Sequence, residues 1–142
     1  MLVFLLRLAG VWLSLAWGAL LLPEAWMISM HAWLGLGDWP GLPLTVYLAR
    51  SVSMLYGFIG LMSLFMSFDA RRYLPLIRFS CGIGLPLGPV MLAVGVNSGM
   101  PWVWAVAEGV CIVIFCVLIL AAAAKEEREI AKGAPRVKAP AS

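Results

Sequence analysis

Two charged side chains lie inside long apolar runs of this chain. Arg50 follows Pro43 by seven residues, and Glu108 follows Pro101 by seven residues. A charged side chain inside a bilayer is costly unless it is paired. If both segments enter the membrane from the same side, the two opposite charges have the same depth, about 10 Å below their helix starts. We therefore predict that Arg50 and Glu108 form a buried ion pair, directly or through water.

This pair is open to two interpretations. A buried ion pair is often an assembly device and is weak evidence for catalysis. Alternatively, Arg50 and Glu108 form a ligand centre in a pocket that opens to the outer face, where Arg50 binds an anionic group and Glu108 exchanges protons. We expect His31, Glu24 and Trp104 at the rim of such a pocket. His31 is the only histidine, and imidazole is the side-chain type suited to proton exchange near neutral pH, but a histidine bonded to backbone or a lipid headgroup explains it as well.

Other chemistry-bearing motifs are missing from the sequence. It has no Ser-His-Asp set, no HExxH and no glycine-rich phosphate loop outside an apolar span. A single histidine without cysteine or carboxylate at ligand spacing makes no metal or haem site. The three cysteines lie in apolar runs and are interpreted as small buried hydrophobic residues. We therefore predict no catalytic residue, no cofactor and no metal, and the sequence leans away from an enzyme.

The composition is that of a membrane protein. Of the 142 residues, 63% are hydrophobic and only 12% are charged, with a mean hydropathy of +0.99. Soluble domains are about half apolar and a quarter charged. The net charge of +3 is too small and too dispersed to indicate nucleic acid as a partner. The lipid bilayer is the expected environment, and a membrane protein is the expected partner.

The apolar runs predict an all-α membrane protein, a four-transmembrane-helix bundle with a short outer interfacial helix. Each run has the roughly 20 residues that a spanning helix needs. The first lacks the basic start and small-residue cleavage site of a signal peptide, so we expect it to be retained. The predicted spans are about 2–22, 43–68, 73–96 and 101–124, with the interfacial helix at about 23–34. Residues 1–124 are thus expected to be the transmembrane domain, and residues 125–142 a cytoplasmic basic tail.

The positions of lysine and arginine predict the orientation. They lie near the N-terminus, around the connection between the second and third spans, and after the fourth span, whereas the other two connections contain none. By the positive-inside rule, both termini are expected in the cytoplasm, with the chain in the cell inner membrane as a multi-pass protein. The other side carries a predicted aromatic belt of Trp26, Trp33, Trp39, Trp102 and Trp104.

Small residues at helical spacing predict where the spans pack. One face of the second span carries Arg50, Ser53, Gly57, Gly60, Leu64 and Ser67, and the first span offers Arg7, Gly10, Ser14 and Trp17. The third span contains a GxxxG pattern from Gly84 to Gly88. We expect these faces to pack within one chain, while the oligomeric state is not determined by the sequence.

Four segments resemble a group of small bacterial four-helix membrane proteins, the BphX-like and DoxX-like families. They are PEAWMISMHAWLGLGDWP, YLARSVSMLYGFIG, SFDARRYLPLIRF and GMPWVWAVAEG. The resemblance covers most of residues 1–124 and implies the same four-helix fold. DoxX-like proteins are associated with membrane redox or sulfur-stress complexes, and neither family supplies a catalytic motif that can be placed on this chain.

Three functions remain open at this stage. The first is an accessory or structural subunit of the membrane, with Arg50 and Glu108 holding the bundle together. The second is a small proton-coupled transporter that uses Glu108. The third is a quinone-type redox component that binds its ligand near His31, Arg50 and Trp104.

Overall fold

The computed structural model describes residues 1–133, and these form helices, turns and loops without a strand among them. Four stretches are long and apolar enough to cross a membrane, judged by length and composition. They are Leu2–Leu21, Pro43–Phe68, Leu74–Asn97 and Trp102–Gly133. The prediction of four helices of spanning length is therefore confirmed, and their starts lie within about two residues of the predicted ones.

The first stretch is α1 (Leu2–Ser14), a 3-10 turn (Leu15–Trp17) and α2 (Gly18–Leu21). The predicted interfacial helix is α3 (Glu24–Trp33), which follows Pro23. The other three stretches are α4 (Pro43–Phe68), α5 (Leu74–Asn97) and α6 (Trp102–Gly133).

The last helix is longer than its predicted span. Residues 125–133 continue α6 as helix, so the first half of the predicted tail is helical. Arg136 and Lys138, which belong to the same predicted tail, lie outside the described residues.

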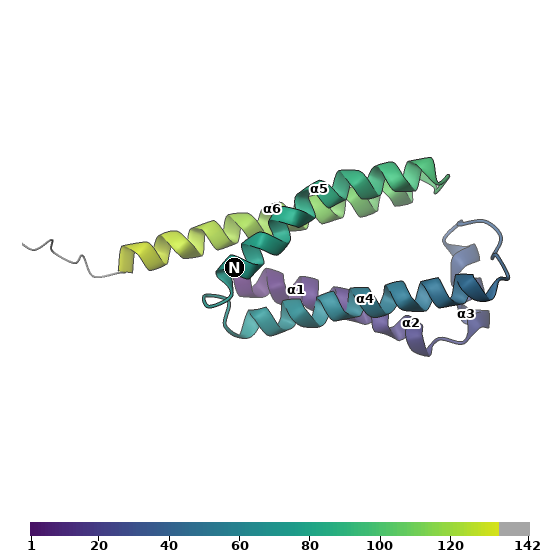
Figure 1. Cartoon of the computed structure of the whole chain (residues 1–142), viewed down its shortest axis with the longest axis horizontal. Helices are drawn as coiled ribbons and strands as arrows, with labels where there is room; N and C mark the ends of the chain where they lie inside the picture. The colour runs from purple at the N-terminus through teal and green to yellow at the C-terminus, as the bar shows by residue number, and fades with distance from the viewer. Residues whose placement is uncertain (134–142) are drawn as a thin grey trace, which may run out of the picture.

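The helices are arranged as two antiparallel hairpins (Figure 1). Hairpin I is α1, the 3-10 turn and α2 packed on α4, and hairpin II is α5 packed on α6. The N-terminus, the α4–α5 turn and the C-terminal part of α6 lie at one end, called here the basic end. The helix α3 and the α5–α6 turn lie at the other, called here the tryptophan end.

Glycines bring the two helices of hairpin I into backbone contact. A methyl group placed on Gly60 of α4 would lie 2.5 Å from the Ser14 amide nitrogen and 2.7 Å from the Gly10 carbonyl oxygen. One on Gly57 would collide with the indole of Trp17, whose Nε1–H donates to the Met54 carbonyl oxygen at 3.0 Å. The small-residue face predicted for the second span is therefore the face that packs on the first.

Glycines also bring the two helices of hairpin II into backbone contact. A methyl group on Gly88 would lie 2.7 Å from the Gly109 carbonyl oxygen, and one on Gly109 would lie 2.8 Å from the Gly88 carbonyl oxygen. Gly84 faces the Cys116 sulfur, 2.5 Å from where its Cβ would be. The GxxxG pattern thus packs within the chain, as expected, and α5 continues as helix through Pro86 and Pro89.

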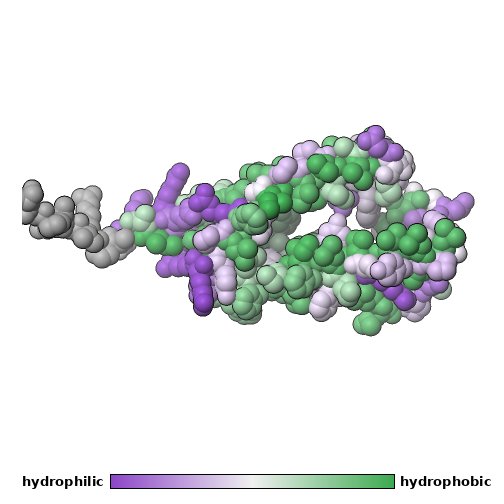
Figure 2. Space-filling model, viewed as in Figure 1, coloured by the Kyte–Doolittle hydropathy of each residue, from purple (hydrophilic) through white to green (hydrophobic). Residues whose placement is uncertain are grey.

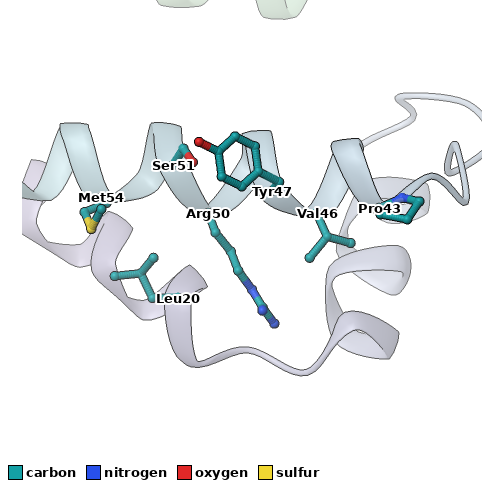
Figure 3. A pocket seen from close by; sticks show the side chains of 7 residues that line it. All are labelled: Leu20, Pro43, Val46, Tyr47, Arg50, Ser51 and Met54. Carbon is teal, nitrogen blue, oxygen red and sulfur yellow. The ribbon is translucent and has the colours of Figure 1, made fainter.

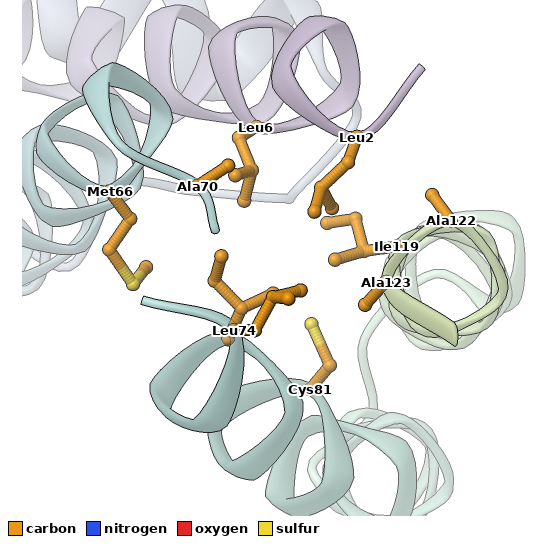
Figure 4. Close-up of a cluster of buried hydrophobic side chains, with 10 residues drawn as sticks. Leu2, Leu6, Met66, Ala70, Leu74, Cys81, Ile119, Ala122 and Ala123 are labelled. Atoms are coloured by element: carbon orange, nitrogen blue, oxygen red, sulfur yellow. The ribbon is translucent and has the colours of Figure 1, made fainter. Parts of the chain in front are cut away.

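The two hairpins share one hydrophobic core, at the basic end (Figure 4). Ile77 of α5 and Ala123 of α6 are its most buried members, at 1% and 0% exposure. The core takes residues from α1, α4, the α4–α5 turn, α5 and α6: Leu2, Leu6, Met66, Ala70, Leu74, Ile77, Cys81, Ile119, Ala122 and Ala123.

Toward the tryptophan end the hairpins diverge, and the space-filling view shows an opening between them (Figure 2). This arrangement differs from the compact four-helix bundle that the sequence predicts. The physical reason is the placement of the small residues, because glycines allow close approach within each hairpin. Beyond the shared core, the hairpins do not present facing glycines to each other among the described residues.

Candidate functional site

Glu108 of hairpin II is hydrogen-bonded to hairpin I. The Tyr56 hydroxyl of α4 donates to the Oε1 atom of Glu108 on α6, at 3.2 Å, and both side chains are half-buried. Within the described residues this is the side-chain hydrogen bond that links the hairpins away from the basic end.

The residues beside Tyr56 and Glu108 follow from helical spacing. Val52 and Ile59 lie four residues before and three residues after Tyr56, so they share its side of α4. By the same spacing, Trp104 and Cys111 share the side of α6 that carries Glu108. All four of these residues are exposed, at 41–47% for Val52, Ile59 and Trp104. We call these sides of α4 and α6, which carry Val52, Tyr56, Ile59, Trp104, Glu108 and Cys111, the wedge.

Arg50 lies elsewhere, in a groove on hairpin I (Figure 3). The groove has a volume of about 410 Å³, and its lining comes from α2 and α4. The Arg50 side chain is exposed and extends from α4 past Leu20 toward the chain that joins α2 to α3. We call it the Arg50 groove, and its lining residues are Leu20, Pro43, Val46, Tyr47, Arg50, Ser51 and Met54.

The structure therefore does not bring Arg50 and Glu108 into a direct ion pair. In the part of the chain that the structure describes, the ion pairs are Arg71–Glu126 at 2.7 Å and Arg78–Glu127 at 2.8 Å, both at the basic end. Of the predicted pairing, directly or through water, the direct ion pair is absent from the described residues, and Glu108 accepts a hydrogen bond from a tyrosine hydroxyl.

The reason is the rotation of α4. Six residues correspond to about 240° around an α-helix, so Arg50 and Tyr56 cannot face the same neighbour. Gly57 packs on Trp17 of the 3-10 turn and Gly60 packs on α1, and these contacts fix the rotation that turns Tyr56 toward hairpin II. Arg50 belongs to the face that packs within hairpin I and extends beyond the glycine contacts, where the groove begins.

Both charges lie near one edge of a spanning segment rather than at its middle. Glu108 is about 27 Å along α6 from Glu126, which pairs with Arg71 at the basic end. Arg50 is likewise about 27 Å from Phe68, the last residue of α4. The hydrocarbon core of a bilayer is about 30 Å thick. For helices that cross it, both charges would therefore lie close to the boundary at the tryptophan end.

The residues predicted as a pocket rim are placed separately from the Arg50 groove. His31 of α3 is half-buried and packs edge-on against Trp39, with ring centroids 5.2 Å apart. Glu24 is exposed at the start of α3, and Trp104 is 41% exposed on the wall of the wedge. None of the three lines the Arg50 groove. The structure thus does not gather His31, Arg50 and Trp104 around that groove, which was the arrangement expected for a quinone.

Three polar residues of these sites were not singled out from the sequence. They are Tyr56, which bonds to Glu108, and the two hydroxyl residues of the Arg50 groove, Tyr47 and Ser51. A buried tyrosine hydroxyl usually finds a hydrogen-bond partner, and this signal could have pointed to Tyr56.

The described residues contain no group of three or more His, Cys, Asp or Glu side chains placed to hold a metal ion. The cysteines differ from one another: Cys81 is buried, Cys116 is half-buried and Cys111 is exposed. The expectation of buried cysteines is therefore wrong for Cys111, which lies on a wall of the wedge.

Removing the hydrogen bond between the hairpins should reveal a coupling between its two residues. We expect Tyr56→Phe and Glu108→Ala each to lower the free energy of unfolding in detergent. The double variant should lose less free energy of unfolding than the two single variants together, with a coupling energy of about 1 kcal/mol. The measurement is a double-mutant cycle on the unfolding midpoint.

Arg50 provides the control for this cycle. Because Arg50 and Glu108 do not form a direct ion pair, Arg50→Gln should show no coupling to Glu108→Ala beyond about 0.3 kcal/mol. A coupling of Glu108 with Arg50 larger than its coupling with Tyr56 would contradict the geometry described here.

Comparisons of the chain with protein-family models, with curated proteins and with solved structures find no match. The resemblance to the BphX-like and DoxX-like families therefore stays a prediction.

Proposed function

We propose that this chain is a small multi-pass protein of a bacterial inner membrane, with both termini in the cytoplasm and an accessory role toward another membrane protein. The four apolar helices and their exposed apolar side chains support the membrane location (Figure 2). The clustering of arginine and lysine at the basic end supports the orientation.

The wedge is the surface through which the chain would bind its partner in the accessory role. Its walls are apolar except for Tyr56 and Glu108, and hydrophobic side chains such as Ile59 and Trp104 are exposed in it. A carboxylate offers about four acceptor positions, and in the described residues Tyr56 fills one of them. The acyl chains beside the apolar walls cannot use the remaining acceptors. A polar side chain on a neighbouring helix can, and it would replace the water or headgroup that reaches Glu108 near the edge of the hydrocarbon core. The occupant that suits this surface is therefore a transmembrane helix of a membrane-protein partner.

Site-specific photocrosslinking in native membranes tests this role. A photoreactive phenylalanine analogue is placed at Ile59 or Trp104, on the two walls of the wedge. Matched controls carry it at Phe58 or Val110, each about 200° around the helix from Tyr56 or Glu108 and exposed at 56% or 44%.

We expect one adduct of the same discrete mass from both wedge positions and none from the two controls. An adduct of twice the mass of the chain would instead identify a second copy of this chain. Adducts with lipid alone, or equal adducts from wedge and control positions, would equally contradict the accessory role.

A second function, a proton-coupled transporter, is favoured by one observation. Glu108 is half-buried in the wedge and is bound by a neutral hydroxyl rather than neutralised by Arg50. Under this alternative, Glu108→Gln in proteoliposomes should stay folded and abolish proton movement. Under the accessory role the same variant should keep its wedge crosslinks, because the glutamine oxygen still accepts from Tyr56.

A further inference from the structure

The Arg50 groove combines one exposed guanidinium with two hydroxyl groups and an apolar lining. Arg50 has no carboxylate within 4 Å among residues 1–133. Tyr47 and Ser51 of the groove each carry a hydroxyl that can donate a hydrogen bond. Leu20, Val46 and Met54 supply the apolar part (Figure 3).

The position of the groove matches the headgroup region of a bilayer. At 1.5 Å per residue α4 is about 39 Å long, so it exceeds a hydrocarbon core of about 30 Å. With the excess divided between the two ends, the Cα atom of Arg50 lies only about 6 Å inside the core. A long arginine side chain can extend from that depth to the headgroups while its methylene groups stay in apolar surroundings.

We infer that the Arg50 groove binds the phosphate of an anionic phospholipid, with the guanidinium on the phosphate oxygens and an acyl chain along Leu20, Val46 and Met54. A guanidinium holds two phosphate oxygens through parallel hydrogen bonds, which gives this pair both strength and geometry. The apolar lining favours a lipid over free phosphate, because free phosphate leaves that surface unused. The inference rests on the membrane location proposed above but not on the accessory role.

Native mass spectrometry of the chain in dodecyl maltoside tests this site. The protein is mixed with phosphatidylglycerol or with phosphatidylcholine at equal concentration, and the bound lipids are counted. We expect the wild type to retain phosphatidylglycerol in preference to phosphatidylcholine. Arg50→Gln should bind phosphatidylglycerol about tenfold more weakly, which corresponds to the loss of one charge-assisted contact.

Two further variants separate the groove from general charge and from folding. Arg7→Gln removes the same charge from an exposed arginine of α1 that lies outside the groove, and it should bind like the wild type. Val46→Trp fills the groove and keeps Arg50, and it should lose binding as Arg50→Gln does. If Arg50→Gln does not fold, the loss of phosphatidylglycerol binding in Val46→Trp still tests the inference.

Several results would overturn the inference. They are unchanged phosphatidylglycerol binding in Arg50→Gln or Val46→Trp, an equal loss in Arg7→Gln, or equal retention of phosphatidylcholine by the wild type. Displacement of the lipid by 10-fold excess inorganic phosphate would assign the groove to a free anion instead. Each of these outcomes is independent of the wedge crosslinks, so a failure here is distinguishable from a failure of the accessory role.

Discussion

Gly60→Leu should unfold hairpin I or force its two helices apart. A Cβ atom at this position would lie 2.5 Å from the Ser14 amide nitrogen and 2.7 Å from the Gly10 carbonyl oxygen, both backbone atoms that cannot move aside. Overpacking against movable side chains costs about 1–3 kcal/mol, so contact with backbone should cost about 3 kcal/mol or more. The measurement is the unfolding midpoint in detergent, together with helix content by circular dichroism.

Gly82→Leu is the matched control for this substitution. Gly82 is also an interior helical glycine in a spanning stretch, but a Cβ atom there would meet nothing within 4 Å. The same exchange should therefore be neutral or slightly stabilising, since leucine has the higher helix propensity. Equal losses at Gly60 and Gly82 would mean that glycine contacts do not close hairpin I.

Ala123→Leu should separate the two hairpins at the basic end. Ala123 of α6 has 0% exposure and lies in the core that joins both hairpins (Figure 4). Three added carbon atoms cannot be accommodated without displacing α1 or α5, and such overpacking costs about 2 kcal/mol. We expect a lower unfolding midpoint and a broader distance distribution between spin labels at Leu44 and Val96, which are exposed residues toward the tryptophan end of each hairpin.

The control for the core substitution lies two residues away. Ala121 is on the same helix but exposed, so Ala121→Leu should leave both the midpoint and the label distances unchanged. If Ala123→Leu left the label distances as in the wild type, the shared core would not be the joint between the hairpins.

Local properties of the sequence predict the helices and their internal contacts well. Pro43 and Leu74 begin α4 and α5 close to where the apolar runs start, because hydropathy and proline placement are properties of a single segment. The glycine faces around Gly60 and Gly88 are found by the same means, since helical spacing alone puts small residues on one side.

The direct partner of Glu108 was not predicted correctly, because it depends on how the helices rotate against each other. Equal distances of Arg50 and Glu108 from their helix starts say nothing about the direction in which each side chain points. That direction is fixed by Gly57 and Gly60 for α4 and by Gly109 for α6, and it pairs Glu108 with Tyr56. Arg50 lies on the packing face of α4, and this already indicated that it faces the first span rather than hairpin II.

The prediction of a compact bundle was wrong for a related reason. The local sequence does not determine over what length two hairpins remain in contact after the helices of each have packed together. The buried side chains that join them, such as Ile77 and Ala123, come from both hairpins and cluster at one end. The divergence that produces the wedge is therefore a property of the whole chain.

The self-contained packing of each hairpin has a consequence for biosynthesis. The contacts of Gly10 with Gly60 are complete once α4 has been translated, before α5 or α6 exists. If the chain is inserted into a membrane during translation, its first half can thus fold there while the second half is still on the ribosome. Hairpin II then has one assembly step left. Its basic end, which carries Ile77 and Ala123, packs against hairpin I, which has already formed.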